Sequence, residues 1–228
     1  MNTPRTTIIL VRHGECSANI EERFRGRCDF ELNELGRQQA EQIASALQKL
    51  SPTALYSSPL RRAVQSLEPA ARALGLELRI EEDLTNISLG AWEGRKKADI
   101  AREQPELWDL WKHRPEELSF PGMESLDEVG RRARAVLDRL VQAHAGETIA
   151  LCTHRTVLKP LVPFCLETWT PGRSPLEGRR EARSAGGWFW KFHFDTASLS
   201  LLVHDERGYS LFSLNRIDHL TQVNREWN

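Results

Sequence analysis

Two histidines and two arginines follow short apolar runs in this sequence, and together they could carry out chemistry on a phosphate. Arg12 and His13 come directly after the first run, and Arg62 lies a few residues after the second. His154 comes directly after a third run. An arginine presents a planar fork of N–H donors that matches phosphate oxygens, and a neutral imidazole can attack phosphorus as a covalent nucleophile. These residue types therefore indicate phosphoryl transfer, with the arginines offsetting charge in the transition state.

Each of these residues also has a purely structural interpretation. Arg62 could pair with Glu68 or with solvent, and a histidine that follows a strand is often a hydrogen-bonded core residue. What favours a shared site is the repetition of the same residue types after three separate runs. Gly14 adds to this interpretation, since a glycine lets a ligand approach the backbone closely.

The runs themselves have the length and composition of buried parallel strands, and helical patterns separate them. Asn33 is a fair N-cap for the first long helix, Gly75 closes the second, and Pro69 predicts a kink or an early break within it. Because ligands bind at the carboxyl ends of strands in open α/β sheets, we expect the four residues to meet there. The expected strands are 8–11, 54–57, 76–80 and 148–153, and the expected helices are 33–49, 60–74, 93–112 (interrupted at Pro105), 125–144 and 157–166.

The fold class that this alternation predicts is α/β. We expect a three-layer α/β/α sandwich whose central sheet is mainly parallel, with helices on both faces and an antiparallel edge strand. A hairpin at that edge would come from three closing apolar runs, 188–194, 198–204 and 209–214. The 228 residues suit a single domain, 1–228, with a helical insertion at about 93–124 and a loop insertion at about 168–187.

Composition argues against several classes of protein. With 31 Lys and Arg against 32 Asp and Glu, the formal net charge is −1, which is unlike a general nucleic-acid binder. No apolar run reaches membrane-spanning length and no signal-peptide core is present, so we expect a cytoplasmic protein with no membrane partner. The four cysteines are widely spaced without a CxxC pair, which indicates neither a zinc site nor a disulfide framework. A homodimer is compatible with these observations.

Further motifs extend the pattern over nearly the whole chain. They are LVRHGE (10–15) with Asn19, RFRG (23–26) through Asp29, 32–33 with 36–40, SSPLRRA (57–63), LGAWEG (89–94), PGMES (121–125), 153–154, 195–198, and 214–215 through 219–220. Together they resemble the histidine phosphatase superfamily, also called the phosphoglycerate mutase-like family. The resemblance implies a phosphohistidine intermediate on His13, with Arg12, Arg62 and His154 in the phosphate pocket, and no metal or other cofactor. It also implies that Asn19, Arg25 and Gly26 face the substrate.

The chain departs from this family at the position of the general acid. The family's usual acid is a glutamate two residues after the leucine that opens the block LTNISLG (84–90), and the corresponding residue here is Asn86. An amide cannot protonate a leaving oxygen, and loss of a positioned acid typically costs roughly 10²–10⁴-fold in rate. Glu82 or Asp83 could replace it, although a surface position suits both better. Alternatively, the leaving group needs little protonation, as in an acyl phosphate, a phenol or a phosphohistidine nitrogen. Asn86 could still hydrogen-bond a substrate oxygen.

Other departures leave two interpretations each. Cys16, where the family often has threonine, could be a thiol activated by the cationic pocket or a small buried filler, and we favour the filler. Arg155 and Thr156 replace the more frequent Gly-Gly, so that Arg155 either points at the substrate or forms a surface salt bridge. The arginine-bearing loop 168–187 could be a mobile lid that supplies a cation, or a solvated or oligomer-contact loop.

The resemblance and the four residues lead to one expected function and two alternatives. We expect a metal-independent phosphatase that hydrolyses a small phosphorylated metabolite through phosphohistidine on His13. A phosphotransferase of the phosphoglycerate mutase type is the second enzymatic hypothesis. It ranks below the phosphatase because the block 89–94 looks more like that of the phosphatases of the family than like that of the mutases. A protein of another class, which binds a phosphorylated ligand with little or no turnover, is suggested by Asn86. The natural substrate is not evident from the sequence.

Overall fold

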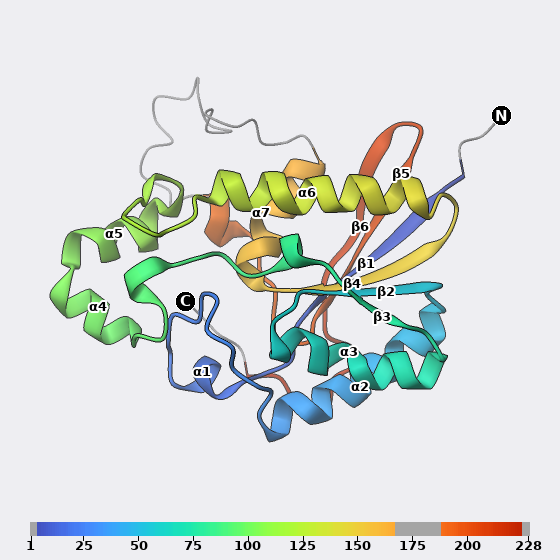
Figure 1. Cartoon of the computed structure of the whole chain (residues 1–228), viewed down its shortest axis with the longest axis horizontal. Helices are drawn as coiled ribbons and strands as arrows, with labels where there is room; N and C mark the ends of the chain where they lie inside the picture. Colours follow the sequence, from blue (N-terminus) through green and yellow to red (C-terminus); the bar gives the residue numbers. More distant parts are fainter. Residues whose placement is uncertain (1–3, 167–187, 225–228) are drawn as a thin grey trace.

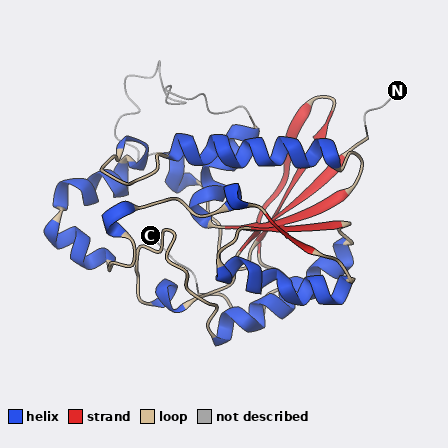
Figure 2. Cartoon of the chain, in the orientation of Figure 1, coloured by secondary structure: helices blue, strands red, loops and turns tan. Residues whose placement is uncertain are grey.

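A six-stranded sheet forms the centre of the molecule, as the computed structural model shows for the residues that it describes, 4–166 and 188–224 (Figures 1 and 2). The strand order is β3-β2-β4-β1-β5-β6. The strands are β1 (Thr6–Arg12), β2 (Ala54–Ser57), β3 (Leu78–Ile80), β4 (Thr148–Thr153), β5 (Leu199–Asp205) and β6 (Gly208–Arg216). The first four are mutually parallel. At one edge of the sheet, β5 runs antiparallel to β1, and β6 runs antiparallel to β5. The predicted sheet, with its closing hairpin, is therefore confirmed.

Helices cover both faces of the sheet, which confirms the three-layer prediction (Figure 1). Along β1, Ile8 and Leu10 pack in the cluster that includes the apolar stripes of α6 and α7, whereas Ile9 and Val11 pack with α2 and α3. This alternation is the period of two that a strand imposes on a sheet buried on both sides. The α-helices are α1 (Ser17–Ile20), α2 (Glu34–Leu50), α3 (Arg61–Leu74), α4 (Lys97–Glu103), α5 (Pro105–His113), α6 (Leu126–Ala143) and α7 (Arg155–Cys165).

Helix boundaries follow the local signals in the sequence. The side chain of Asn33 accepts a hydrogen bond from the backbone N–H of Gly36 at 2.8 Å and so caps α2. Gly75 ends α3 with a φ of +66°, a left-handed conformation that suits glycine. Pro105 stands at the first turn of α5, where its missing N–H costs nothing. Of the kink or early break expected at Pro69, the early break is wrong, because α3 continues through that residue.

The strand predicted at 188–194 is wrong. Trp188–Lys191 forms a short 3₁₀ helix instead. Its aromatic side chains pack on α5, with the rings of Phe189 and Trp190 lying 5.9 and 5.5 Å from the ring of Trp111. A short apolar run buried on several sides looks the same in sequence whether it is a strand or a helical turn, so periodicity could not separate the two.

The remaining expectations concern the two insertions. Segment 93–124 contains α4 and α5, which lie beside one end of the sheet (Figure 1). We propose that segment 93–124 is an insertion and that the chain forms a single domain. The loop predicted at 168–187 lies outside the described residues. Within the described part of the chain, no helix is long and apolar enough to cross a membrane.

Candidate active site

The two histidines and two arginines singled out in the sequence meet at the carboxyl ends of β1 and β4. Arg12 is the last residue of β1 and His13 follows it, while Arg62 lies in the first turn of α3. His154 is the N-cap of α7, directly after β4. The rings of His13 and His154 lie 5.2 Å apart, and all four side chains are at most 1% exposed. The sheet therefore gathers the four residues as expected.

The loop after β1 is fixed by a close backbone contact with the start of α2. A Cβ atom on Gly36 would lie 2.0 Å from the carbonyl oxygen of Glu15, so only glycine fits there. Nearby, the Glu15 carboxylate accepts a hydrogen bond from Asn33, and the backbone N–H of Gly14 donates to Ser66. These contacts hold the backbone beside His13 in one position.

His13 is set up as a nucleophile by the hydrogen bond that its ring makes. Its Nδ1 lies 2.7 Å from the carbonyl oxygen of Gly14. A carbonyl oxygen can only accept, so Nδ1 carries the proton and Nε2 keeps its lone pair. Burial, followed by the positive charges of Arg62, Arg12 and Arg25, lowers the pKa of His13 well below its usual value. The ring is therefore neutral near pH 7, as a nucleophile must be.

His154 has one ring nitrogen against Ser58, and its other ring nitrogen has no partner among the described residues. Its Nε2 lies 2.7 Å from the hydroxyl of Ser58, which also accepts a hydrogen bond from the backbone N–H of Leu60 at 3.3 Å. The Ser58 hydroxyl can donate its proton to Nε2, and in that tautomer the ring proton resides on Nδ1. This Nδ1 is buried and has no hydrogen-bond partner within the described residues. Burial and the charge of Arg62 lower the pKa of His154 well below its usual value.

The arginines supply the charge that an anion would need. Arg62 donates to the carbonyl oxygens of Cys28 (2.8 Å) and Gly26 (3.0 Å), and Arg12 donates to that of Phe194 at 2.6 Å. Burial and the nearby charge of Arg25 lower the pKa of Arg62 to about 10, so it remains charged near pH 7. Two fixed cations beside two neutral imidazoles match a phosphoryl dianion.

A narrow recess opens beside the two histidines. Its lining contains cations, amides and aromatic rings, and none of the described lining residues is an aspartate or a glutamate. The lining consists of His13, Arg23, Phe24, Arg25, Gly26, Asn86, Leu89, Lys97, Trp111, His154, Arg155 and Thr156. Among the described residues, no group of three or more His, Cys, Asp or Glu side chains could hold a metal ion.

Asn86 lies in the wall of this recess, and both ends of its amide bind the protein. Its Nδ2 donates to the carbonyl oxygen of Gly26 at 2.9 Å, and its Oδ1 accepts from the hydroxyl of Thr156. On the main chain, Arg27 and Arg132 each donate to the Asn86 carbonyl oxygen at 3.3 Å.

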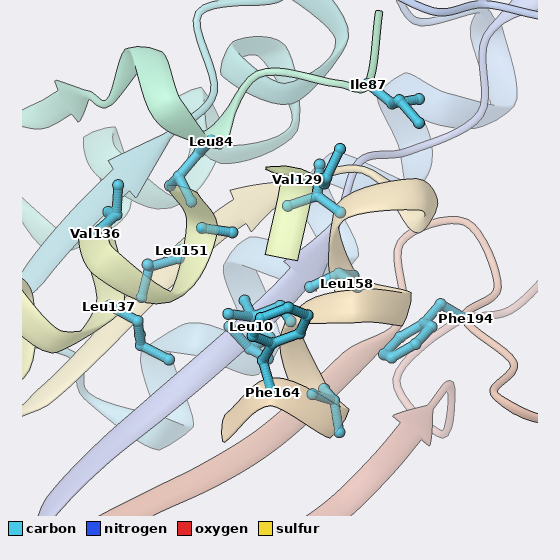
Figure 3. Packing of buried hydrophobic residues seen from close by; sticks show 14 of the residues in the cluster. Leu10, Leu84, Ile87, Val129, Val136, Leu137, Leu151, Leu158, Phe164 and Phe194 are labelled. Carbon is cyan, nitrogen blue, oxygen red and sulfur yellow. The ribbon is translucent and has the colours of Figure 1, made fainter. Parts of the chain in front are cut away.

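The residues around Asn86 anchor its loop in the core. Figure 3 shows Leu84 and Ile87 among the buried side chains of the cluster that also contains Leu10 of β1 and Leu151 of β4. Glu82 and Asp83, considered as substitutes for the missing acid, are exposed and do not line the recess. The expected surface position of both carboxylates therefore fits the structure.

The other residues singled out in the sequence divide into two groups. Arg25, Gly26 and Arg155 line the recess, and Arg155 is only 8% exposed, so it does not have the surface position that one alternative expected. Asn19 is not part of the lining. Its side-chain oxygen accepts hydrogen bonds from the backbone N–H and the thiol of Cys16, where α1 begins. Cys16 itself is fully buried, as expected of a filler.

Sequence reasoning missed several residues of the site. Ser58 lies in the block 57–63, and Thr156 follows Arg155 two residues after His154, so both positions offered a signal. Arg23 lies in the block 23–26 beside Arg25, which offered a signal. Lys97 and Trp111 offered none, because the packing of α4 and α5 beside the 23–26 loop brings them to the recess. Arg23 and Lys96 form an isolated β-bridge, which fixes this neighbourhood.

The lowered pKa values of both histidines make a prediction about pH. ¹⁵N NMR of the two rings is expected to show neutral imidazoles, with the proton of His13 on Nδ1, at pH values below the usual histidine midpoint of about 6.5. Below that pH the unfolded chain takes up protons that the folded rings exclude. The free energy of unfolding should therefore fall as the pH is lowered through this range. A His13 midpoint at or above 6.5 would contradict the prediction.

Comparison with known proteins places this geometry in a wider group. The family model described as the histidine phosphatase superfamily (branch 1) matches residues 8–173. A bifunctional protein of Mycobacterium tuberculosis is 34% identical over 197 residues, which cover 86% of this chain and 50% of that protein. The chain thus spans about half the length of the first curated relatives it matches.

Two further relatives cover nearly the whole chain. Phosphoserine phosphatase 1 of Hydrogenobacter thermophilus is 30% identical over 213 residues, which cover 93% of each protein. Among solved structures, a mycobacterial glucosyl-3-phosphoglycerate phosphatase in complex with VO₃ is 26% identical, with a TM-score of 0.78. The match covers 92% of this chain and 98% of that one.

Proposed function

The chain belongs to the histidine phosphatase superfamily (branch 1), and we propose that it is a metal-independent phosphatase acting through a phosphohistidine on His13. Its substrate is a small phosphorylated metabolite. The observation that carries the proposal is the state of His13, whose Nδ1 is held by the Gly14 carbonyl while the lone pair of Nε2 is free for attack. Phosphoserine phosphatase and phosphoglycerate phosphatase relatives support phosphatase activity.

The proposed reaction has two steps. In the first, the terminal phosphoryl group binds between Arg12, Arg62 and the Nδ1–H of His154, which offset its charge. Nε2 of His13 attacks phosphorus, a new N–P bond forms, and the P–O bond to the leaving group breaks. In the second, water attacks the phosphohistidine and the N–P bond breaks with its electron pair returning to Nε2 of His13. One proton of that water stays on the released phosphate, and the other passes to the phosphate or to solvent. Neither step needs a metal ion, because side chains supply the positive charge.

Substrate recognition beyond the phosphoryl group is assigned to the recess. Arg25, Gly26 and Arg155 are proposed substrate contacts, since they line it beside the two histidines. Asn86 is a proposed contact as well, although its amide already binds Gly26 and Thr156. Asn19 retains only an indirect role, through the loop that follows His13.

Turnover of 4-nitrophenyl phosphate in the presence of EDTA tests this function. We expect a burst of 4-nitrophenol equal to the amount of enzyme, followed by steady release of phosphate, because the phosphohistidine forms first and is then hydrolysed. A phosphoglycerate mutase-type enzyme would instead pass the phosphoryl group to a second hydroxyl of a phosphoglycerate. Binding of phosphorylated ligands without a burst would favour the ligand-binding alternative that Asn86 suggests, and would overturn the proposal.

A further inference from the structure

We propose that Ser58 is a positioning residue of this site, which holds His154 in the tautomer that donates from Nδ1 to the bound phosphoryl group. This inference rests on the proposed phosphatase function and assigns one more residue to it. Two independent observations carry it. The Ser58 hydroxyl has a single acceptor among the described residues, and the opposite nitrogen of the His154 ring is buried there without a partner.

The main chain places Ser58 against the end of β4. Its backbone N–H donates to the carbonyl oxygen of Cys152 at 2.9 Å, which continues the pairing of β2 with β4 by one residue. Its carbonyl oxygen accepts a hydrogen bond from the hydroxyl of Ser57 at 2.9 Å. Pro59 follows, and a residue before proline is biased towards extended backbone. The Ser58 side chain is therefore held beside His154, which directly follows β4.

The hydroxyl proton of Ser58 has one acceptor in the part of the chain that the structure describes. The residue is fully buried. Its hydroxyl oxygen accepts from the backbone N–H of Leu60 at 3.3 Å and lies 2.7 Å from Nε2 of His154. A backbone N–H cannot accept, so the hydroxyl proton is directed to Nε2. A buried O–H group without an acceptor costs free energy, and a lone pair on Nε2 avoids that cost.

The position of the His154 ring proton matters because the ring has only one. Burial and the charge of Arg62 lower the pKa of His154 well below its usual value, so the ring is neutral near pH 7. A doubly protonated ring would donate from both nitrogens whatever its neighbours, whereas a neutral ring donates from one. With the lone pair of Nε2 turned to Ser58, that one donor is Nδ1.

A phosphoryl oxygen supplies the acceptor that Nδ1 lacks. Nδ1 of His154 is buried and has no hydrogen-bond partner among the described residues. His154 lines the recess together with His13, and their rings lie 5.2 Å apart, so a phosphoryl group attacked by His13 would lie next to His154. A donor on Nδ1 would bind one of its oxygens. The opposite tautomer would turn a lone pair towards those oxygens and repel them.

¹⁵N NMR of the His154 ring tests the assignment directly. The signals of this ring are identified by their loss in His154→Asn. At pH 7 the wild type should carry one proton on Nδ1 and none on Nε2. Ser58→Ala should release the ring to a mixture of both tautomers, because Nε2 no longer receives a hydrogen bond. A proton on Nε2 in the wild type, or an unchanged Nδ1–H tautomer in Ser58→Ala, would overturn the proposal.

The affinity for inorganic phosphate, measured by calorimetry, gives the consequence for binding. Only the Nδ1–H form can donate, so Ser58→Ala should weaken binding by at least the factor that the NMR populations give, about threefold if a third of the rings are in that form. In a His154→Ala background, Ser58→Ala should have no further effect, because Ser58 acts through His154. An equal loss in both backgrounds would show that the hydroxyl acts on packing instead, and would contradict the proposal.

Thr6→Val is the matched control for the loss of a buried hydroxyl. Thr6 is 1% exposed, and its hydroxyl also accepts a backbone N–H, that of Gly146 at 3.0 Å, but it stands at the opposite end of β1 from the site. This variant should retain the wild-type tautomer of His154 and the wild-type affinity for phosphate. A loss of affinity equal to that of Ser58→Ala would count against a specific role of Ser58.

Rapid-quench formation of phosphoenzyme from 4-nitrophenyl phosphate separates this inference from the proposed function. Ser58→Ala should form the phosphohistidine more slowly than the wild type, because the same N–H stabilises phosphoryl oxygens in the transition state. An unchanged rate would overturn the role of Ser58 while the phosphohistidine mechanism stands. No phosphoenzyme in the wild type would overturn the proposed function, whereas the tautomer and the phosphate affinity would still decide what Ser58 does.

Discussion

His13→Ala is expected to lower kcat for 4-nitrophenyl phosphate by at least roughly 10⁴-fold, the scale on which loss of a covalent nucleophile acts. The reason is geometric. Nε2 of His13 holds the lone pair, because Nδ1 is bound to the Gly14 carbonyl, and its ring lies 5.2 Å from that of His154. Without it, Arg12 and Arg62 could still bind a phosphate, but no phosphoenzyme would form. Steady-state kinetics and rapid quench measure the two effects.

Control variants guard this test against unfolding. His113→Ala removes an exposed histidine of α5 and should leave kcat unchanged. His13→Gln preserves a polar side chain in the buried position and should fold like the wild type by circular dichroism while losing the burst. If His13→Ala keeps its rate within tenfold of the wild type, His13 is not the nucleophile.

The double variant Asn86→Glu/Thr156→Gly is expected to raise kcat for alkyl phosphates by about 100-fold, which restores part of what a positioned acid contributes. Asn86→Glu alone should gain less. Its carboxyl group would face the Gly26 carbonyl and the Thr156 hydroxyl, the two groups that now bind the amide. The Gly26 carbonyl oxygen can only accept, so it would take the carboxyl proton, and the Thr156 hydroxyl can donate to the other carboxyl oxygen, which would leave neither for the substrate. Removing the hydroxyl frees one of them.

Matched variants separate acid catalysis from altered packing. Asn86→Gln/Thr156→Gly has the same side-chain length without an acid, and Thr156→Gly alone makes only the cavity. Both should hydrolyse alkyl phosphates no faster than the wild type. A gain in the glutamine variant equal to that in the glutamate variant would show that space, rather than proton donation, limits the rate.

Much of the fold could be predicted because its signals are local. Four apolar runs gave the parallel strands, and the Asn33 cap and the Gly75 stop fixed the ends of α2 and α3. The phosphate-handling residues could be located for the same reason, since each follows a strand and strand ends converge at one edge. The error at 188–194 came from an aromatic run whose partners, such as Trp111, lie far away in sequence.

The recess could not be predicted from local signals, because long-range packing builds it. Nothing near Lys97 or Trp111 indicates that α4 and α5 bring them to the recess beside His13. The sequence identified Asn86 as a substitution, but only the structure shows that Thr156, itself a substitution, donates to its amide. The two changes are therefore best understood together, as one wall of the site.

The central claim is that His13 accepts a phosphoryl group in a recess without a carboxylic acid. Rapid-quench phosphorylation by aryl phosphates of graded leaving-group pKa tests both halves at once. We predict an acid-labile phosphate that maps to His13 by mass spectrometry, and a formation rate that falls steeply as the leaving group becomes more basic. Label on another residue, no label, or a rate independent of the leaving group would contradict the account.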